Sequence, residues 1–252
     1  MTKTVSRPTR RLTATGLGVV TAWTLAACAD GPPPLDEISE SAQQTMNDAQ
    51  SISFTMSDPD HLLDDELTSM EYSGQFNETN FHLNASMSDT NIEALVVDED
   101  SAFMKFETGD EDLDALFEMS EEQEGKWIEA PESDLIGVED STKQFEEISN
   151  SVFDLINNLS EEELEAVEVE EDELDGEPVY VYNVPATGEV ETELVPSANT
   201  ASFYFLQDSD TLMRLYASTD DETAVFTFSD YDSVDPVEAP SEDEIADIDW
   251  QF

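Results

Sequence analysis

The chain has 252 residues and a formal net charge of −54, because 62 acidic residues stand against only eight basic ones. A surface this acidic excludes attraction to nucleic acids or to an anionic membrane face. A hydrophobic content of 38%, with 13 phenylalanines, excludes a wholly disordered chain.

The first 28 residues have the parts of a secretory signal that ends in a lipidation site. The basic segment that opens it contains Lys3, Arg7, Arg10 and Arg11. An uncharged run follows and ends in Leu-Ala-Ala-Cys, which resembles the lipobox of bacterial lipoproteins, and Cys28 is the single cysteine of the chain. We expect residues 1–27 to be a signal peptide that is removed. Cys28 would then carry acyl chains such as palmitate, which hold the protein on the extracytoplasmic face of the cell membrane. The alternative is an ordinary signal with an incidental cysteine, and Arg10 and Arg11 leave twin-arginine export open.

All 62 acidic residues follow Cys28, where the basic residues are only Lys105, Lys126, Lys143 and Arg214. The acids could form cation sites or a solvated surface adapted to high external salt. They are spread along the chain without an EF-hand loop, which favours the halophilic surface. At 1 M salt the Debye length is about 3 Å, so most of the self-repulsion would be screened.

Residues 28–34 are expected to form an extended tether, because three consecutive prolines cannot enter a helix interior. A single domain over residues 35–252 is expected to follow. It begins with a helix over residues 35–50, in which apolar residues recur at three- and four-residue spacing. These residues are Leu35, Ile38, Ala42, Met46 and Ala49.

A first series of short strands is expected next, because apolar and polar residues alternate one by one. The expected strands cover residues 51–57, 70–76, 81–87, 92–97 and 102–106. An acidic loop over residues 109–125 and a short strand over residues 126–128 follow them. A helix is expected over residues 141–159, and Ser160 with Glu163 forms a possible capping box for another short helix.

A second series of strands is expected over residues 178–184, 201–206, 212–218 and 223–229, whereas residues 164–169 are ambiguous. The tail over residues 234–248 contains Pro236 and Pro240 and is expected to lie along the domain edge. This order predicts an α+β fold. Its sheet would be antiparallel and strongly curved, with the helices covering one face. We expect a monomer.

Short motifs along the chain carry a resemblance to a known family. They are AQSISF at residues 49–54, VVDEDSAFMK at 96–105, GKWI at 125–128, DTL with Arg214 at 210–214, FTFSDY at 226–231 and VEAP at 237–240. With the lipobox, these motifs resemble the LolA-like carrier fold, and more narrowly the actinobacterial lipoproteins of the LppX/LprG type. The acidic surface and the acidic insert at residues 107–125 depart from that pattern.

The resemblance implies a half-barrel with helices covering the concave face. It also implies that the domain binds an acyl chain of a lipid or glycolipid in a hydrophobic cavity there and assists its transfer across the cell envelope. Strands rich in phenylalanine and methionine would suit an adaptable apolar pocket. The methionines that follow the signal are Met46, Met56, Met70, Met87, Met104, Met119 and Met213. The candidate lipid-binding residues are Phe54, Met56, Phe81, Leu83, Phe103 and Phe205, which could equally fill the core. The alternative function is an envelope interaction or sensor lipoprotein of the same fold with a filled core and no lipid cargo.

Enzyme signals are few. The chain has two histidines, His61 and His82, and it lacks a Gly-x-Ser-x-Gly motif and a phosphate-binding glycine-rich loop. With no second cysteine, a common zinc site is not supported either. We therefore expect no catalytic residues, no cofactor and no metal site, although cation binding by the acid clusters remains an alternative.

Overall fold

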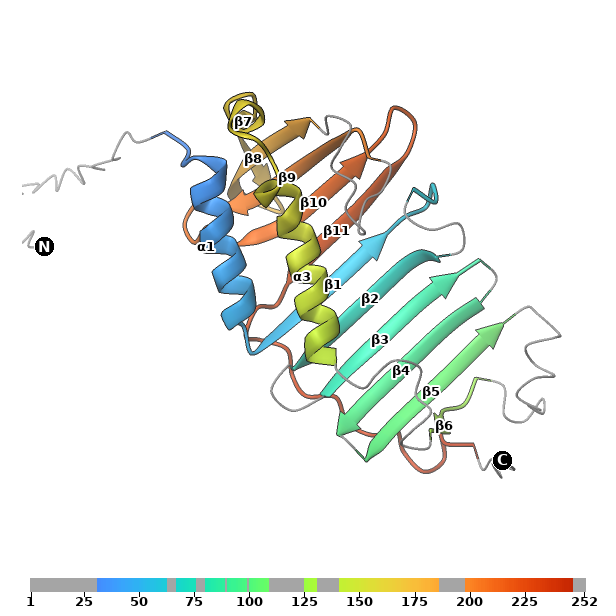
Figure 1. Ribbon diagram of the computed structural model, residues 1–252. Helices are drawn as coiled ribbons and strands as arrows, with labels where there is room; N and C mark the ends of the chain where they lie inside the picture. Colours follow the sequence, from blue (N-terminus) through green and yellow to red (C-terminus); the bar gives the residue numbers. More distant parts are fainter. Residues whose placement is uncertain are drawn as a thin grey trace, which may run out of the picture. The chain divides into compact units, whose positions relative to one another are not determined.

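Two meanders of antiparallel strands meet side by side in a computed structural model of the chain (Figure 1). The structure describes residues 31–62, 67–75, 80–88, 90–98, 100–108, 125–130, 141–185 and 198–246. The chain divides into two units after residue 31, and the described helices and strands all lie in the second unit, residues 32–252.

The first meander runs from the centre of the sheet to one edge. Its strands are β1 (Ser51–Ser57), β2 (Leu67–Gln75), β3 (Asn80–Met87), β4 (Thr90–Asp98), β5 (Ser101–Thr108) and β6 (Ile128–Glu129). Each strand pairs with the next in antiparallel register. The expected strand over residues 126–128 is therefore shorter and shifted, because only Ile128 and Glu129 pair with β5.

The second meander forms the other side of the same sheet. Its strands are β7 (Glu168–Leu174), β8 (Glu177–Pro185), β9 (Thr200–Leu206), β10 (Leu212–Ser218) and β11 (Thr223–Ser229). Antiparallel pairing of β1 with β11 joins the two meanders, which gives the strand order β6-β5-β4-β3-β2-β1-β11-β10-β9-β8-β7. The sheet is curved and open, with β6 and β7 at its edges, as the sequence predicted.

Helices α1 (Leu35–Asp48) and α3 (Ser141–Asn157) lie over one face of this sheet, which we call the inner face (Figure 1). Their apolar side chains form one buried cluster with β1 and β8–β11. Phe54, Phe153, Phe203, Phe226 and Phe228 are each at most 1% exposed in it. Burial of one such side chain contributes roughly 1.5–3 kcal/mol, so this cluster is the main source of stability.

The start of α1 is fixed to the sheet by a tyrosine. The hydroxyl of Tyr182 on β8 donates a hydrogen bond of 2.6 Å to the carbonyl oxygen of Pro33. Burial raises the pKa of this hydroxyl, so it stays protonated and keeps donating at physiological pH. This hydrogen bond therefore fixes the chain just before α1 to strand β8.

The C-terminal tail runs along the strand ends of the first meander, and we call its residues 232–246 the strap. The sequence predicted this position at the domain edge. The strap begins at β1, where the amides of Asp232 and Val234 donate to the carbonyl and hydroxyl oxygens of Ser51. Val237 exchanges two hydrogen bonds with the side chain of Asn80 on β3. The strap ends beside β6, where Trp127 forms a bridge with Ile245.

The helix and strand predictions are confirmed apart from the shifted strand β6 and the strand β7. The capping box is present, since Ser160 and Glu163 each accept from the other's backbone amide at the start of α4 (Glu161–Glu165). Strand β7 was missed, because its sequence EVEEDEL has acids at most positions of both faces and no alternation. Pairing with β8, which is rich in the strand-forming residues Val and Tyr, through the Asp175-Gly176 turn imposes the strand nonetheless. The acidic loop expected over residues 109–125 lies outside the described residues except for Gly125.

Candidate functional site

The inner side chains of β2–β5 form three rows across the strands. They are in register because each strand pairs with the next without a shift at these positions. The first row contains Met70, Ala85, Ile92 and Phe106. The second contains Tyr72, Leu83, Ala94 and Met104. The third contains Gly74, Phe81, Val96 and Ala102.

These rows differ in how deeply they are buried. Phe81, Val96 and Ala102 of the third row form a small buried cluster at the strap end of the strands. Most members of the other two rows are half-buried, and Met87 at the end of β3 continues them. We call Met70, Leu83, Ala85, Met87, Ile92, Met104 and Phe106 the β2–β5 face. Among the described residues, the cluster that contains α1 and α3 reaches β2 through Leu67, Met70 and Tyr72 but includes no residue of β4 or β5.

Charge is strictly divided between the two sides of these strands. The inner rows contain no Asp, Glu, Lys, Arg or His, although the chain has 62 acidic residues. The outer rows of the same strands carry charged or titratable side chains at Glu71, His82, Glu93, Lys105 and Glu107. An uncharged, half-buried face on such an acidic protein is suited to an apolar ligand rather than to an ion.

The six predicted lipid-binding residues are not brought together. Phe54, Met56 and Phe205 lie on the inner face but are packed inside the cluster under the helices. Phe81 lies in the buried third row, and Leu83 is the one candidate on the half-buried face. Phe103 points to the opposite side of the sheet, in register with Leu95 and Glu129.

The space under the helices is filled over β1 and β8–β11. Within the described residues, large side chains of α1, α3 and these strands occupy it, and no acyl chain fits among them without unpacking the core. The expected hollow between sheet and helices is therefore absent from that half, and the β2–β5 face remains as the candidate site.

Sequence reasoning missed Ile92 and Phe106 as members of this face. A usable signal was present, because both follow the same one-by-one alternation that selected Phe81 and Leu83. The methionine pattern did point to Met70, Met87 and Met104. What the sequence could not give was the position of the helices, which decides which inner residues are core and which are half-buried.

Solved structures share this architecture at low sequence identity. LprF from Mycobacterium bovis superposes with a TM-score of 0.52 at 12% identity, over 81% of this chain and 95% of that one. The fold is LolA-like. Lipoprotein LppX from Mycobacterium tuberculosis gives a TM-score of 0.40 at 16% identity, over 80% and 96% of the two chains. A LolA superfamily protein from Nitrosomonas europaea gives 0.24 at 11% identity, over 81% and 95%. The sequence matches no family model and no curated protein.

A tight aromatic contact closes one end of the face in this LolA-like sheet. The rings of Tyr72 and Phe81 stack with centroids 5.5 Å apart. Gly74 lies beside them, and a Cβ atom there would come within 2.6 Å of the Tyr72 hydroxyl oxygen and 2.5 Å of the Phe81 Cβ. The absence of a side chain at residue 74 is therefore what allows the tyrosine ring to lie across its own strand.

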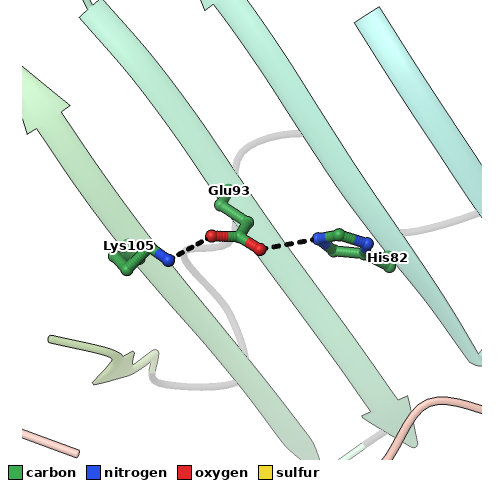
Figure 2. A network of polar contacts seen from close by, with 3 residues as sticks. All are labelled: His82, Glu93 and Lys105. Atoms are coloured by element: carbon green, nitrogen blue, oxygen red, sulfur yellow. Dashed lines mark hydrogen bonds and ion pairs between the residues drawn. The ribbon is translucent and has the colours of Figure 1, made fainter. Parts of the chain in front are cut away.

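The outer side of the same strands carries a polar network (Figure 2). Glu93 on β4 accepts from Lys105 on β5, and its other carboxylate oxygen lies 2.9 Å from Nε2 of His82 on β3. The Lys105 ammonium also lies 4.8 Å from the centroid of the Trp127 ring. Burial acts to raise the pKa of Glu93, but hydrogen bonds and charge from Lys105 and His82 outweigh it and leave the pKa below its usual value.

The two histidines show no catalytic arrangement in the described residues. His82 is engaged by Glu93, and no serine or cysteine takes part in the contacts of that network. His61 lies in the turn after β1 with a φ of 59°. No group of three His, Cys, Asp or Glu side chains that could hold a metal ion occurs within the described ranges.

The predicted anchor lies outside the described residues, which begin at Gly31 and do not include Cys28. Among the helices that are described, none is long and apolar enough to span a membrane.

Proposed function

We propose that this chain is an exported lipoprotein, anchored through Cys28, that binds an acyl chain of a lipid or glycolipid on the β2–β5 face and assists its transfer across the cell envelope. The observation that carries the proposal is the β2–β5 face itself. It is a run of half-buried, uncharged side chains in register on four strands of a chain whose net charge is −54.

Hydrocarbon burial is the source of affinity in this proposal. Each buried CH₂ group of an acyl chain contributes about 0.8 kcal/mol, so partial burial of a long chain offsets the cost of association. Flexible methionines at Met70, Met87 and Met104 suit ligands of variable shape, because the thioether side chain is unbranched and polarisable.

The packed core restricts where the ligand can lie. Phe54, Met56 and Phe205 would contact an acyl chain only if α1 and α3 left the sheet. That movement is costly, because Val152 and Phe153 of α3 are 0% exposed in the shared cluster. The proposal therefore places the ligand beside the helices rather than under them, with Leu83 and the first row as its main contacts.

A photoreactive acyl probe tests the proposal. The full chain is purified from its host membrane, incubated with a fatty acyl chain that carries a diazirine, irradiated, and digested for peptide mass spectrometry. We expect adducts on peptides from β2–β5 and none on the peptides that contain Phe203 or Phe226.

A pair of variants on neighbouring positions controls for general effects. Met104→Glu places a charge on the β2–β5 face and should abolish labelling. Leu95→Glu adds the same charge to β4 on the opposite side of the sheet and should leave labelling intact. Equal labelling of both variants would refute the site. A chain that labels nowhere would favour the interaction or sensor lipoprotein, in agreement with the filled core under the helices.

A further inference from the structure

The turn between α3 and α4 carries one of three acceptor sequences for N-linked glycosylation, which have the pattern Asn-x-Ser/Thr with any residue but proline at x. They begin at Asn77, Asn84 and Asn158, and the first of them lies outside the described residues. We infer that Asn158 is a glycosylation site of the exported chain and that Asn84 is not. This inference needs the export that the proposed function includes, and it adds a covalent modification to it.

Asn158 has the geometry of an accessible acceptor. It follows the last residue of α3, it is exposed, and its side-chain amide makes no hydrogen bond to another described residue. Leu159 is 8% exposed and packs in the helix-covered cluster, which fixes the position of the turn. Ser160 has an extended backbone, with φ −70° and ψ 162°. The acceptor amide is therefore open to solvent on a turn of defined position.

The hydroxyl that completes this acceptor sequence is engaged but easily released. Ser160 Oγ donates to a carboxylate oxygen of Glu163 at 2.7 Å and accepts from the Glu163 amide at 3.3 Å. These contacts belong to the start of α4, which has five residues, none of them buried. Because opening such an exposed turn disturbs little core packing, a transferase can reach the hydroxyl in the folded protein.

Asn84 carries the same motif in a closed position. It lies on β3 between the paired strands β2 and β4, in register with Glu71 and Glu93. Its side-chain oxygen is buried, and the hydroxyl of Ser86 donates to Asn91 at 2.9 Å. A transferase would have to pull β3 out of the sheet before this segment could enter its active site. The fold therefore selects Asn158 over Asn84.

The transfer needs a sugar that is carried on a lipid phosphate. A bond forms between Asn158 Nδ2 and the anomeric carbon of this sugar, and the amide gives up one proton. The bond from the anomeric carbon to the phosphate oxygen breaks, and the lipid phosphate leaves with that electron pair. The helix-covered cluster beside the site contains no described residue of β4 or β5, so a glycan on this turn leaves the β2–β5 face open.

Mass spectrometry of the full chain, purified from its host membrane, tests the inference on the intact protein and after chymotrypsin digestion. We expect one or more sugar masses on the peptide that contains Asn158 and none on the peptide that contains Asn84. Asn158→Gln should remove the added mass completely. Asn157→Gln changes the neighbouring exposed asparagine, which lies outside the acceptor sequence, and should keep the added mass.

Two substitutions at Ser160 separate recognition of the hydroxyl from capping of α4. Asparagine and threonine both serve as N-cap residues, but only threonine completes the acceptor sequence. Ser160→Asn should therefore abolish the added mass and Ser160→Thr should retain it, in proteins with the same circular dichroism spectrum. Retention of the mass in both variants would overturn the inference, because the modification would then not depend on this sequence.

The peptide that begins at Cys28 reports on the proposed anchor in the same spectra. An unmodified Asn158 on a chain with lipid at Cys28 overturns the inference and leaves the proposed function standing. Sugar at Asn158 without lipid at Cys28 supports the inference and rejects the anchor. Sugar at Asn84 as well overturns the selection by the fold, because transfer would then precede folding of β3. A chain with neither modification rejects the inference and the proposed anchor together.

Discussion

The two halves of the sheet have similar strands but are held in different ways. In the helix-covered half, made of β1 and β8–β11, inner side chains such as Phe203 and Phe226 are buried against α1 and α3. In the β2–β5 half, described contacts concentrate at the strand ends and on the outer side: the strap at Asn80, the ring stack beside Gly74 and the network around Glu93. The inner side chains of the β2–β5 half are mostly half-buried, whereas those of the helix-covered half are buried.

The largest expected effect comes from the core of the helix-covered half. Phe203→Ala removes a fully buried ring and should lower the free energy of unfolding by about 3–5 kcal/mol. Met104→Ala truncates a half-buried side chain of the β2–β5 face and should cost about 1 kcal/mol or less. Urea unfolding of both variants measures the difference. Similar losses would mean that the β2–β5 face is as closely packed as the core.

The difference in burial between the two halves of the sheet could be predicted from the sequence only in part. Alternation identified most strands and the inner face, since Ile52, Phe54 and Met56 alternate with serine and threonine. The lipoprotein motifs predicted the LolA-like fold that the structure shares with LprF. The sequence did not predict strand β7, because its acidic residues do not favour a strand. Pairing with β8, which is a tertiary interaction, forms the strand instead.

The candidate site was harder to predict than the fold. Phe103 has an apolar neighbour on each side in the sequence AFMKF, so alternation gave no sign that its ring lies on the outer side of the sheet. The register with Leu95 and Glu129 decides that, and register is not visible in one strand alone. Likewise, Phe205 and Leu83 have equal apolar character in the sequence, and only the position of the helices separates core from half-buried face.

The strap should give the next largest effect. Asn80 is 5% exposed, donates to the carbonyl oxygens of Val97 and Val237 at 3.0 and 3.1 Å, and accepts from the Val237 amide at 2.8 Å. Asn80→Ala leaves these groups unpaired and should cost about 2 kcal/mol.

Amide hydrogen exchange of the Asn80→Ala protein measures which parts of the backbone open more often when the strap contacts are removed. We expect faster exchange in residues 232–246 and in the strap ends of β3 and β4, with the helix-covered half unchanged. Asn84→Ala on the same strand is the control, because the Asn84 side-chain oxygen is buried without a hydrogen-bond partner in the described structure, so its removal should cost little. Uniformly faster exchange across both halves would show that the strap does not support the β2–β5 half in particular.

Gly74→Ala should give a smaller loss of about 1–2 kcal/mol. The new methyl group would lie 2.6 Å from the Tyr72 hydroxyl oxygen and 2.5 Å from the Phe81 Cβ, so the tyrosine ring must move off its own strand. Near-ultraviolet circular dichroism and thermal unfolding follow the ring and the stability together. Ser73→Ala, on the outer side of the same strand, should change neither signal, and an unchanged Gly74→Ala protein would mean that the ring stack is dispensable.

The smallest effect is expected from the outer network of His82, Glu93 and Lys105. Its contribution to stability can be distinguished from the general repulsion among acids by its dependence on pH. The folded pKa of Glu93 lies below its usual 4.5, so its contribution to stability is present in full above that pH and is lost as the pH falls through the folded pKa. Glu93→Gln should therefore cost about 0.5–1 kcal/mol at pH 7, and progressively less below pH 4.5. Glu71→Gln removes an exposed acid from the outer side of β2, two strands away from Glu93, and reports the gain from reduced repulsion alone. If urea unfolding across this pH range gave the two variants the same profile, the network would contribute nothing beyond charge. The β2–β5 half would then depend on its strap and its ring stack.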